Sequence, residues 1–388
     1  MSRALLFSIA YFLLGLVLVL RADLEVFDQA DEARFHLPTI ERYAAELPAP
    51  NVREHGAAMG PLYHLALAIP ARVGADLLLL RVLTLIGATA GVLIAFRATE
   101  GSRVGAAAAA AMALSPYYVG AAVRLSTDDV ALAFVVASLV ALDRGRFAAA
   151  TALAVLAVWT RQIHVWLAVP LLARAWGDPR RMIAALAPVG AGLVLFAIWG
   201  GVVPPAFQKG HVGAEVNLDV LVLVLAAAGV YALFFAPSLA RALRDLRPRW
   251  IDLGITAIGG AALLALHPVA YSMNPRRWGG SVLSLAGRFP DVGGTDLLLW
   301  ALVPVGAIAI LVSIRSALLQ GRAAWAFALP AFVVCNLASD RAYQKYYEPF
   351  LLVAMGAALG RRDEPQRAWW GPAALAVGFL AIDLWRFR

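Results

Sequence analysis

The sequence predicts an all-α integral membrane protein with about 11–13 transmembrane helices. Three observations lead to this fold class. Hydrophobic residues make up 62% of the 388 residues and charged residues only 15%, with a mean hydropathy of +0.75, which is too apolar for a soluble protein. Apolar runs recur along the whole chain. Arginines gather in alternate connections between those runs, as they do in polytopic membrane proteins.

The apolar runs define the expected membrane segments in chain order. The first run follows the residues MSR and lacks a small-residue cleavage site, so we expect a retained helix rather than a signal peptide. A crossing needs about 20 residues, and the three runs between 129 and 173 are shorter, which leaves the number of crossings open. The runs lie near 4–20, 62–96, 104–122, 129–142, 147–160, 163–173, 182–203, 218–240, 250–271, 297–314, 323–338, 347–360 and 368–385.

We expect one integral membrane domain over 1–388, because the sequence contains neither an evident internal repeat nor a soluble domain. The arginine-rich connections are expected to be cytoplasmic. The remaining connections, which would lie outside, hold acids, histidines, amides and both lysines; they are 21–61, 123–128, 161–162, 204–217, 272–296 and 339–346. The polar motifs are therefore expected on the extracytoplasmic face.

Several classes of protein are excluded by composition. The net charge of +8 is spread over many loops, so we expect no nucleic-acid partner. The single cysteine, Cys335, excludes a disulfide framework. The six histidines lack metal-ligand spacing, so we expect no metal site and no cofactor. The strong preference for arginine over lysine indicates a GC-rich genome, and hence a bacterial inner membrane.

The first outer loop, 21–61, contains the stretch DQADEARFHLPTIER. Pro38 is a suitable helix start, and Pro48 and Pro50 are suitable ends. Ile40, Tyr43, Ala44 and Leu47 form an apolar stripe at helical spacing. We therefore expect an amphipathic helix on the membrane surface. Asp31 and Glu32 come just before it and are either solvated helix caps or groups facing a membrane-embedded substrate.

Four further motifs hold polar residues between apolar runs. In VRLSTDDVAL, Asp128 and Asp129 either cap a helix or mark a polar cavity. In WTRQIHVW, Arg161 and Gln162 either form an outer turn or face a cavity, because charge at membrane depth is costly. PPAFQKGHVG supplies Lys209 and His211. DRAYQKYYEPF supplies Arg341 and Lys345 among aromatic residues, which are typical of an interfacial belt or of a phosphate site.

The order and spacing of these motifs resemble the GT-C class of membrane glycosyltransferases. The nearest family is the ALG10/DIE2 family, the dolichyl-phosphate-glucose alpha-1,2-glucosyltransferases. The D-E-x-F-H-x-P-Q signature of that family is matched by Asp31, Glu32, Phe35, His36 and Pro38, with one extra residue before Phe35 and with Thr39 in place of glutamine. The T-P-P-G-L-Y motif is matched by Gly60, Leu62 and Tyr63, with Pro61 between them.

The other matches continue in chain order. The family's Y-T-D resembles Thr127 and Asp128, and its F-R-Q-T-N-I-x-W resembles Arg161, Gln162 and Trp166, with His164 replacing asparagine. Its G-D-K-S-x-H loop keeps Lys209 and His211 but loses the aspartate. The resemblance covers roughly 20–215 and then fades to a basic and aromatic segment at 341–347. It implies a GT-C-like catalytic module over 1–215 and further transmembrane helices over 216–388.

The resemblance also implies a reaction and its participants. A sugar, a hexose and in this family glucose, would move with inversion from a polyprenyl-phosphate donor to a lipid-linked or glycan acceptor within the membrane lipids. Asp31 would be the general base. The substrate-binding residues would be Glu32, His36, Asp128, Arg161, Gln162, Lys209, His211, Arg341 and Lys345. Two alternatives stay open: a lipid or solute transporter or flippase, which favours broken helices in two related halves, and a lipid-linked glycan polymerase or ligase, which places its large outer loop late.

Overall fold

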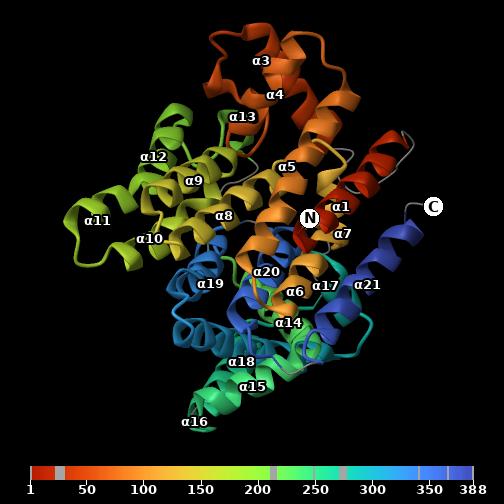
Figure 1. Ribbon diagram of the computed structural model, residues 1–388, viewed down its shortest axis with the longest axis vertical. Coiled ribbons are helices and arrows are strands. Elements are labelled where there is room, and N and C mark those ends of the chain that lie inside the picture. Colours follow the sequence, from red (N-terminus) through yellow and green to blue (C-terminus); the bar gives the residue numbers. More distant parts are fainter. Residues whose placement is uncertain are drawn as a thin grey trace. The chain divides into compact units, whose positions relative to one another are not determined.

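A computed structural model describes residues 2–21, 31–209, 216–247, 250–270, 278–339, 341–364 and 367–386. The chain divides into two compact units. The first unit comprises Met1–Ala98, Ala113–Val212 and Phe379–Arg388, and the second comprises Thr99–Met112 and Gly213–Gly378. Both units are built almost entirely of helices (Figure 1).

The expected all-α membrane fold is confirmed. Among the described residues, four helical segments are long and apolar enough to cross a membrane, or up to six if two bent helix pairs are counted. Shorter apolar helices of 10–17 residues accompany them, and every apolar run expected from the sequence contains a helix. The four long segments are Arg3–Leu20, Leu77–Ala98, Pro179–Trp199 and Leu297–Leu319.

The helices of the first unit follow the expected runs, with two corrections. The run at 62–96 is not continuous, because α4 ends at Arg72 and α5 begins at Leu77, after the sequence VGAD. The run at 104–122 is also broken, because one helix ends at Ala113 and α7 begins at Pro116, with a bend of 56°. In chain order the elements are α1 (Arg3–Leu20), η1 (Glu32–His36), α3 (Leu37–Glu46), η2 (Val52–Glu54), α4 (Leu62–Arg72), α5 (Leu77–Ala98), α7 (Pro116–Ala122), α8 (Asp128–Asp143), α9 (Phe147–Thr160), η3 (Gln162–Leu167), α10 (Ala168–Ala175), α11 (Pro179–Ala185), α12 (Ala187–Trp199) and α13 (Pro205–Gln208).

The helix expected in the first outer loop is present, but its apolar stripe packs on a neighbouring helix instead of lying on the membrane surface. Pro38 lies in the first turn of α3, which ends before Pro48, as expected. Tyr43 and Ala44 pack on Ala68 of α4, and Figure 1 shows α3 and α4 side by side beyond one end of α5. The stripe is buried because a second apolar helix follows in sequence and covers it.

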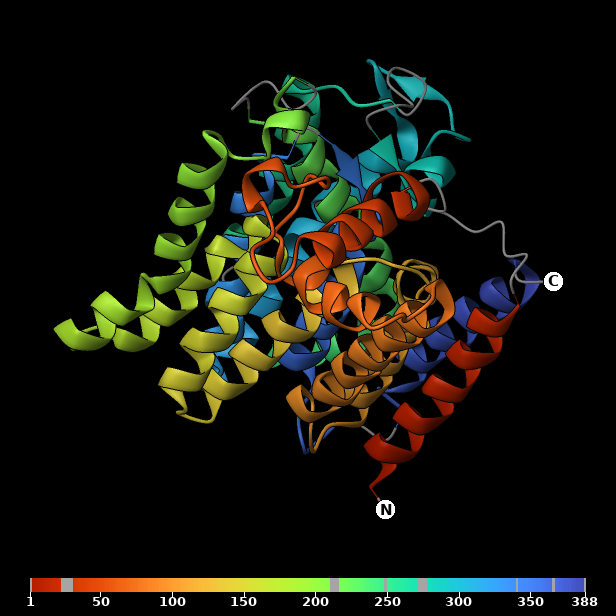
Figure 2. The same ribbon diagram turned by 90° about the horizontal axis from the view of Figure 1, so that it is seen from above.

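The remaining helices of the first unit form a layer around α5 and α8. Helix α5 packs against α1 and α8, and α9 packs against α8 and α12. Figure 2 shows α9 and α12, in yellow and lime, running side by side. Tyr118 of α7 enters the α5–α8 contact and donates a hydrogen bond to the carbonyl oxygen of Ala88 at 2.8 Å.

The second unit surrounds one buried helix, α20 (Glu348–Leu359), in which every residue is buried. Helices α14 and α18 approach closely at Gly306 of α18. A Cβ atom there would lie 1.7 Å from the carbonyl oxygen of Leu225 on α14, so only glycine allows this contact. The other helices are α6 (Arg103–Ala113), α14 (Leu218–Phe234), α15 (Ala236–Leu246), α16 (Trp250–Leu266), α17 (Ser281–Ala286), α18 (Leu297–Leu319), α19 (Ala323–Asn336), η5 (Gln344–Tyr346) and α21 (Trp370–Arg386), of which the last extends into the first unit.

Two short strand pairs complete the second unit. Strand β1 (Trp278–Gly279) pairs in parallel with β4 (Ala342–Tyr343). Strand β2 (Asp291–Val292) pairs antiparallel with β3 (Thr295–Asp296). The two residues between β2 and β3 are glycines with φ angles of 64° and 79°, which is the backbone that a tight hairpin turn requires.

Candidate functional site

Glu32 begins the π-helical turn η1 and is 3% exposed. Its carboxylate forms a two-point ion pair with the guanidinium of Arg81 on α5. The backbone N–H of Leu125 donates a further hydrogen bond to it at 2.8 Å. Burial acts to raise the pKa of Glu32, but the bonds from Arg81 and Leu125 and the charge of Arg124 outweigh burial and lower it. Glu32 is therefore an ionised anchor for the turn that carries Asp31.

His36, at the other end of η1, starts a chain of buried rings. Its Nδ1 lies 2.9 Å from Nε2 of His64 on α4, and the His64 ring lies edge-on to His55, with centroids 4.7 Å apart. Nδ1 of His55 lies 2.8 Å from the hydroxyl of Tyr43. Trp199 of α12 stacks at 6.4 Å from His55 and donates a hydrogen bond to the carbonyl oxygen of Val52. These ring contacts together fix the loop between α3 and α4.

Asp128 and Arg161 form an ion pair that joins the start of α8 to the end of α9. Both side chains are mostly buried, at 21% and 18% exposure. Arg161 has extended backbone and separates α9 from η3, so the break expected within WTRQIHVW is present. The side chain of Gln162 donates to the carbonyl oxygens of Ala58, at 3.0 Å, and Val202, at 3.3 Å.

The segment AAMGPLYHL connects several of these groups. A Cβ atom on Gly60 would lie 2.1 Å from the carbonyl oxygen of Trp159, so only glycine allows this close approach. The hydroxyl of Thr127 lies 2.8 Å from the sulfur of Met59. This segment therefore contacts both the STDD and the WTRQ segments.

Helix α13 brings the lysine motif to the same unit. The ring of Phe207 lies edge-on to Phe35 of η1, with centroids 5.5 Å apart. Lys209 follows α13 and is exposed. His211 lies outside the described residues.

Side-chain and backbone contacts thus connect five segments that are far apart in sequence. The segment of Asp31 contacts the other four through Glu32–Leu125, His36–His64 and Phe35–Phe207, and through the segment of Gly60, which touches Trp159. Asp31 itself is half-buried, lies at the N-cap of η1 and is engaged in an interaction. The structure therefore brings Asp31, Glu32, His36, Asp128, Arg161, Gln162 and Lys209 into one unit.

Arg341 and Lys345 belong to the second unit. The backbone N–H of Arg341 donates to the hydroxyl of Ser339 at 3.4 Å. The ammonium of Lys345 lies 5.2 Å from the ring centroid of Tyr346. Their membership of the site stays a prediction.

Sequence reasoning missed Arg81, Arg124 and His55. Arg81 lies inside an apolar run, and a lone arginine there is costly unless it is paired; this cost was a usable signal for an acidic partner. No comparable signal marked His55, because its partners Tyr43 and Trp199 come from distant elements. In the described part of the chain, no group of three or more histidine, cysteine, aspartate or glutamate side chains is arranged to hold a metal ion.

No known protein family matches the chain, and no curated protein matches it. Among solved structures, the chain is similar to ArnT from Cupriavidus metallidurans in the apo state, at 16% identity and a TM-score of 0.38. The match covers 93% of this chain and 78% of that one. Similarity at this level does not assign the chain to a family.

Proposed function

We propose that the protein is an inverting membrane glycosyltransferase of the GT-C type, acting on a polyprenyl-phosphate sugar, a hexose such as glucose. The observation that carries this proposal is the convergence of five polar segments around Asp31 in one helical membrane unit. A structural cap needs none of these long-range contacts. A site that deprotonates an acceptor and stabilises a lipid phosphate needs acids and cations from several elements.

The reaction assigns one role to Asp31. Its carboxylate accepts the proton of an acceptor hydroxyl while that oxygen attacks the anomeric carbon. The bond from the anomeric carbon to the phosphate oxygen breaks, and its electron pair stays on the polyprenyl phosphate. A single displacement of this kind inverts the anomeric centre.

The leaving phosphate needs cations placed in advance. Lys209 is an exposed cation two residues after Phe207, which contacts Phe35 of η1, and His211 would act beside it as a hydrogen-bond donor. Arg161 is neutralised by Asp128, so we propose that it positions Gln162 and the donor rather than meeting the phosphate as a full charge. Arg341 and Lys345 remain proposed phosphate contacts from the second unit.

Glu32 and His36 are proposed as positioning residues. Both oxygens of Glu32 are occupied by donors from the protein, and His36 is bonded to His64. Their bonds fix the two ends of η1 and so the direction in which Asp31 faces. The expected acceptor is a lipid-linked or other glycan at the extracytoplasmic face.

The experiment is a transfer assay with the purified protein in proteoliposomes. Release of polyprenyl phosphate from a polyprenyl-phosphate hexose is measured with glycolipid acceptors. Asp31→Asn should keep the melting temperature and lower the rate roughly 10²–10⁴-fold, the usual contribution of a general base. Glu41→Gln, which removes an exposed acid of α3, is the matched control and should keep the rate.

Three results would contradict the proposal. Full activity of a folded Asp31→Asn would remove the base assignment. No release by the wild type from any polyprenyl-phosphate sugar, together with movement of a labelled lipid or solute across the bilayer, would favour the transporter or flippase. Extension of a glycan chain by lipid-linked repeats would favour the polymerase or ligase.

A further inference from the structure

The stretch RALRDLRPRW, 241–250, plays no part in the proposed reaction. It holds four arginines within nine residues. Its first part belongs to α15, which follows the apolar helix α14 after the single residue Phe235, with a bend of 96°. Helix α15 therefore leaves the direction of α14 at nearly a right angle.

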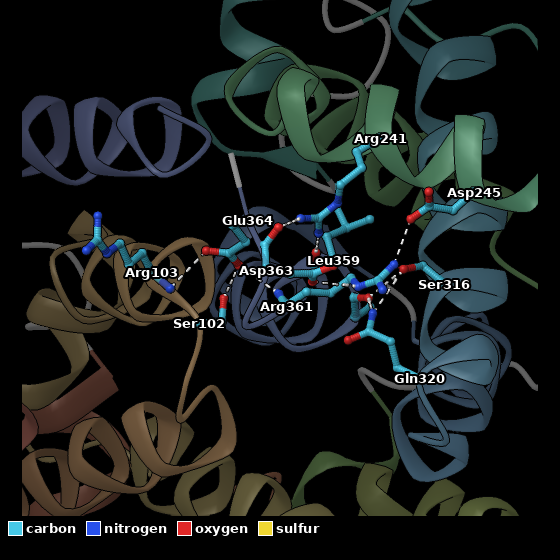
Figure 3. A network of polar contacts seen from close by, with 11 residues as sticks. Ser102, Arg103, Arg241, Asp245, Ser316, Gln320, Leu359, Arg361, Asp363 and Glu364 are labelled. Atoms are coloured by element: carbon cyan, nitrogen blue, oxygen red, sulfur yellow. Dashed lines mark hydrogen bonds and ion pairs between the residues drawn. The ribbon is translucent and has the colours of Figure 1, made fainter. Parts of the chain in front are cut away.

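One side of α15 packs on protein. Leu239 and Ala242 are buried, and the helix contacts α18 and α20. Two polar residues of α15 bind other parts of the second unit (Figure 3). Arg241 donates a hydrogen bond to the carbonyl oxygen of Leu359 at 3.1 Å, and Asp245 forms an ion pair with Arg361 at 2.6 Å. The negative charge of Asp245 is thereby neutralised within the protein.

The other side of α15 is exposed, and among the described residues no ion pair is formed by its arginines. Ala240, Arg244 and Arg247 are exposed there. Arg247 ends the helix with φ 41° and ψ 50°, a left-handed conformation that costs an L-residue roughly 1–2 kcal/mol and favours glycine. Backbone preference therefore does not explain the arginine at this position, whereas a use for its side chain would.

Exposed apolar residues mark the level of the membrane close by. Trp250, the first residue of α16, is 86% exposed, and Ile251, Ile255 and Ile258 on the same helix are also exposed. Apolar residues exposed along a membrane helix face lipid tails, and tryptophan favours the headgroup level. Arg244 and Arg247 come shortly before this level in the chain.

We propose that Arg244 and Arg247 of α15 form a binding surface for anionic phospholipid headgroups. The guanidinium group matches the phosphate in shape and charge, and an anionic leaflet attracts each such arginine by about 1 kcal/mol. This proposal is independent of the proposed transfer reaction.

The test is native mass spectrometry of the detergent-purified protein titrated with phosphatidylglycerol or phosphatidylcholine. The wild type should bind phosphatidylglycerol more tightly. Arg244→Gln/Arg247→Gln should weaken that binding by about 25-fold, or roughly fivefold per arginine. Arg244→Lys/Arg247→Lys should retain most of the affinity, because the charge is kept.

The control Arg34→Gln/Arg53→Gln removes two exposed arginines of the first unit and should leave the affinity unchanged. If Arg244→Gln/Arg247→Gln does not fold, Ala240→Glu, which adds an opposite charge to the same exposed side, should lower the affinity instead. Equal binding of both lipids by the wild type would overturn the proposal. So would an affinity for phosphatidylglycerol in the arginine-to-glutamine variant within twofold of wild type, or an equal loss in the control.

Discussion

Replacing Arg81 by methionine should be among the most destabilising single changes in the first unit. The pair that it forms with Glu32 is buried, at 17% and 5% side-chain exposure. Among the described residues, Arg81→Met leaves the buried Glu32 carboxylate with the N–H of Leu125 as its hydrogen-bond donor and with the charge of Arg124 nearby. Loss of one member of a buried pair costs about 3–5 kcal/mol. An exposed pair is worth about 0–1 kcal/mol, so Arg181→Met, at the pair with Asp178 that is 57% and 46% exposed, is the control.

A second substitution isolates the charge from the packing. Glu32→Gln/Arg81→Met removes both charges but keeps an oxygen that accepts from Leu125, so stability should return to within about 1 kcal/mol of wild type. The measurement is the free energy of unfolding of the purified protein in detergent, from denaturant titration.

The pH dependence supplies an independent readout. The pKa of Glu32 lies below its ordinary value of 4.5 because of Arg81, so the pair stabilises the folded protein above that pH, and its stability is lost as pH falls through the folded pKa. In Arg81→Met burial dominates and raises the pKa, so this variant should lose less stability than wild type on acidification from neutral pH. A cost below 1 kcal/mol at pH 7, or identical pH profiles, would refute the reasoning.

Two further predictions concern packing and burial. Gly60→Ala should lower stability by more than about 2 kcal/mol, because its Cβ atom would meet the carbonyl oxygen of Trp159 at 2.1 Å; Gly190→Ala, which has no atom within 4 Å, should be neutral or slightly stabilising, and equal melting temperatures would contradict this. Burial lowers the pKa of His55 to about 3, so protonation of His55 favours the unfolded state. The free energy of unfolding should therefore fall by about 1.4 kcal/mol for each unit by which the pH is lowered from 6.5 to 3. Unfolding curves of His55→Gln across that range should lack this component; an unchanged slope would show that His55 is protonated when folded.

The sequence predicts some features of this fold better than others, for physical reasons. Hydropathy locates the helices because each must be apolar to enter the membrane, and the break at Arg161 is predicted because charge at depth is costly. The same pattern does not reveal what the stripe of Tyr43 and Ala44 covers, since a membrane surface and a neighbouring helix satisfy it equally. The partner of Glu32 is not predicted, because Arg81 lies within an apolar run, and hydropathy identifies such a run without indicating the partner of a charge inside it.

The charges of the first unit indicate what the site can bind. Glu32 is neutralised by Arg81, and Asp128 by Arg161, so these four charges contribute little net field. Beside these pairs, Asp31 adds one negative charge, and Arg34, Arg124 and Lys209 add positive charges. A neutral hydroxyl beside Asp31 and an anionic phosphate beside Lys209 match this arrangement better than a cationic substrate does, because the positive charge of Lys209 would repel a cation. Lys209→Gln should therefore weaken the proposed donor's binding more than the acceptor's, whereas Asp31→Asn should lower the rate with the donor still bound.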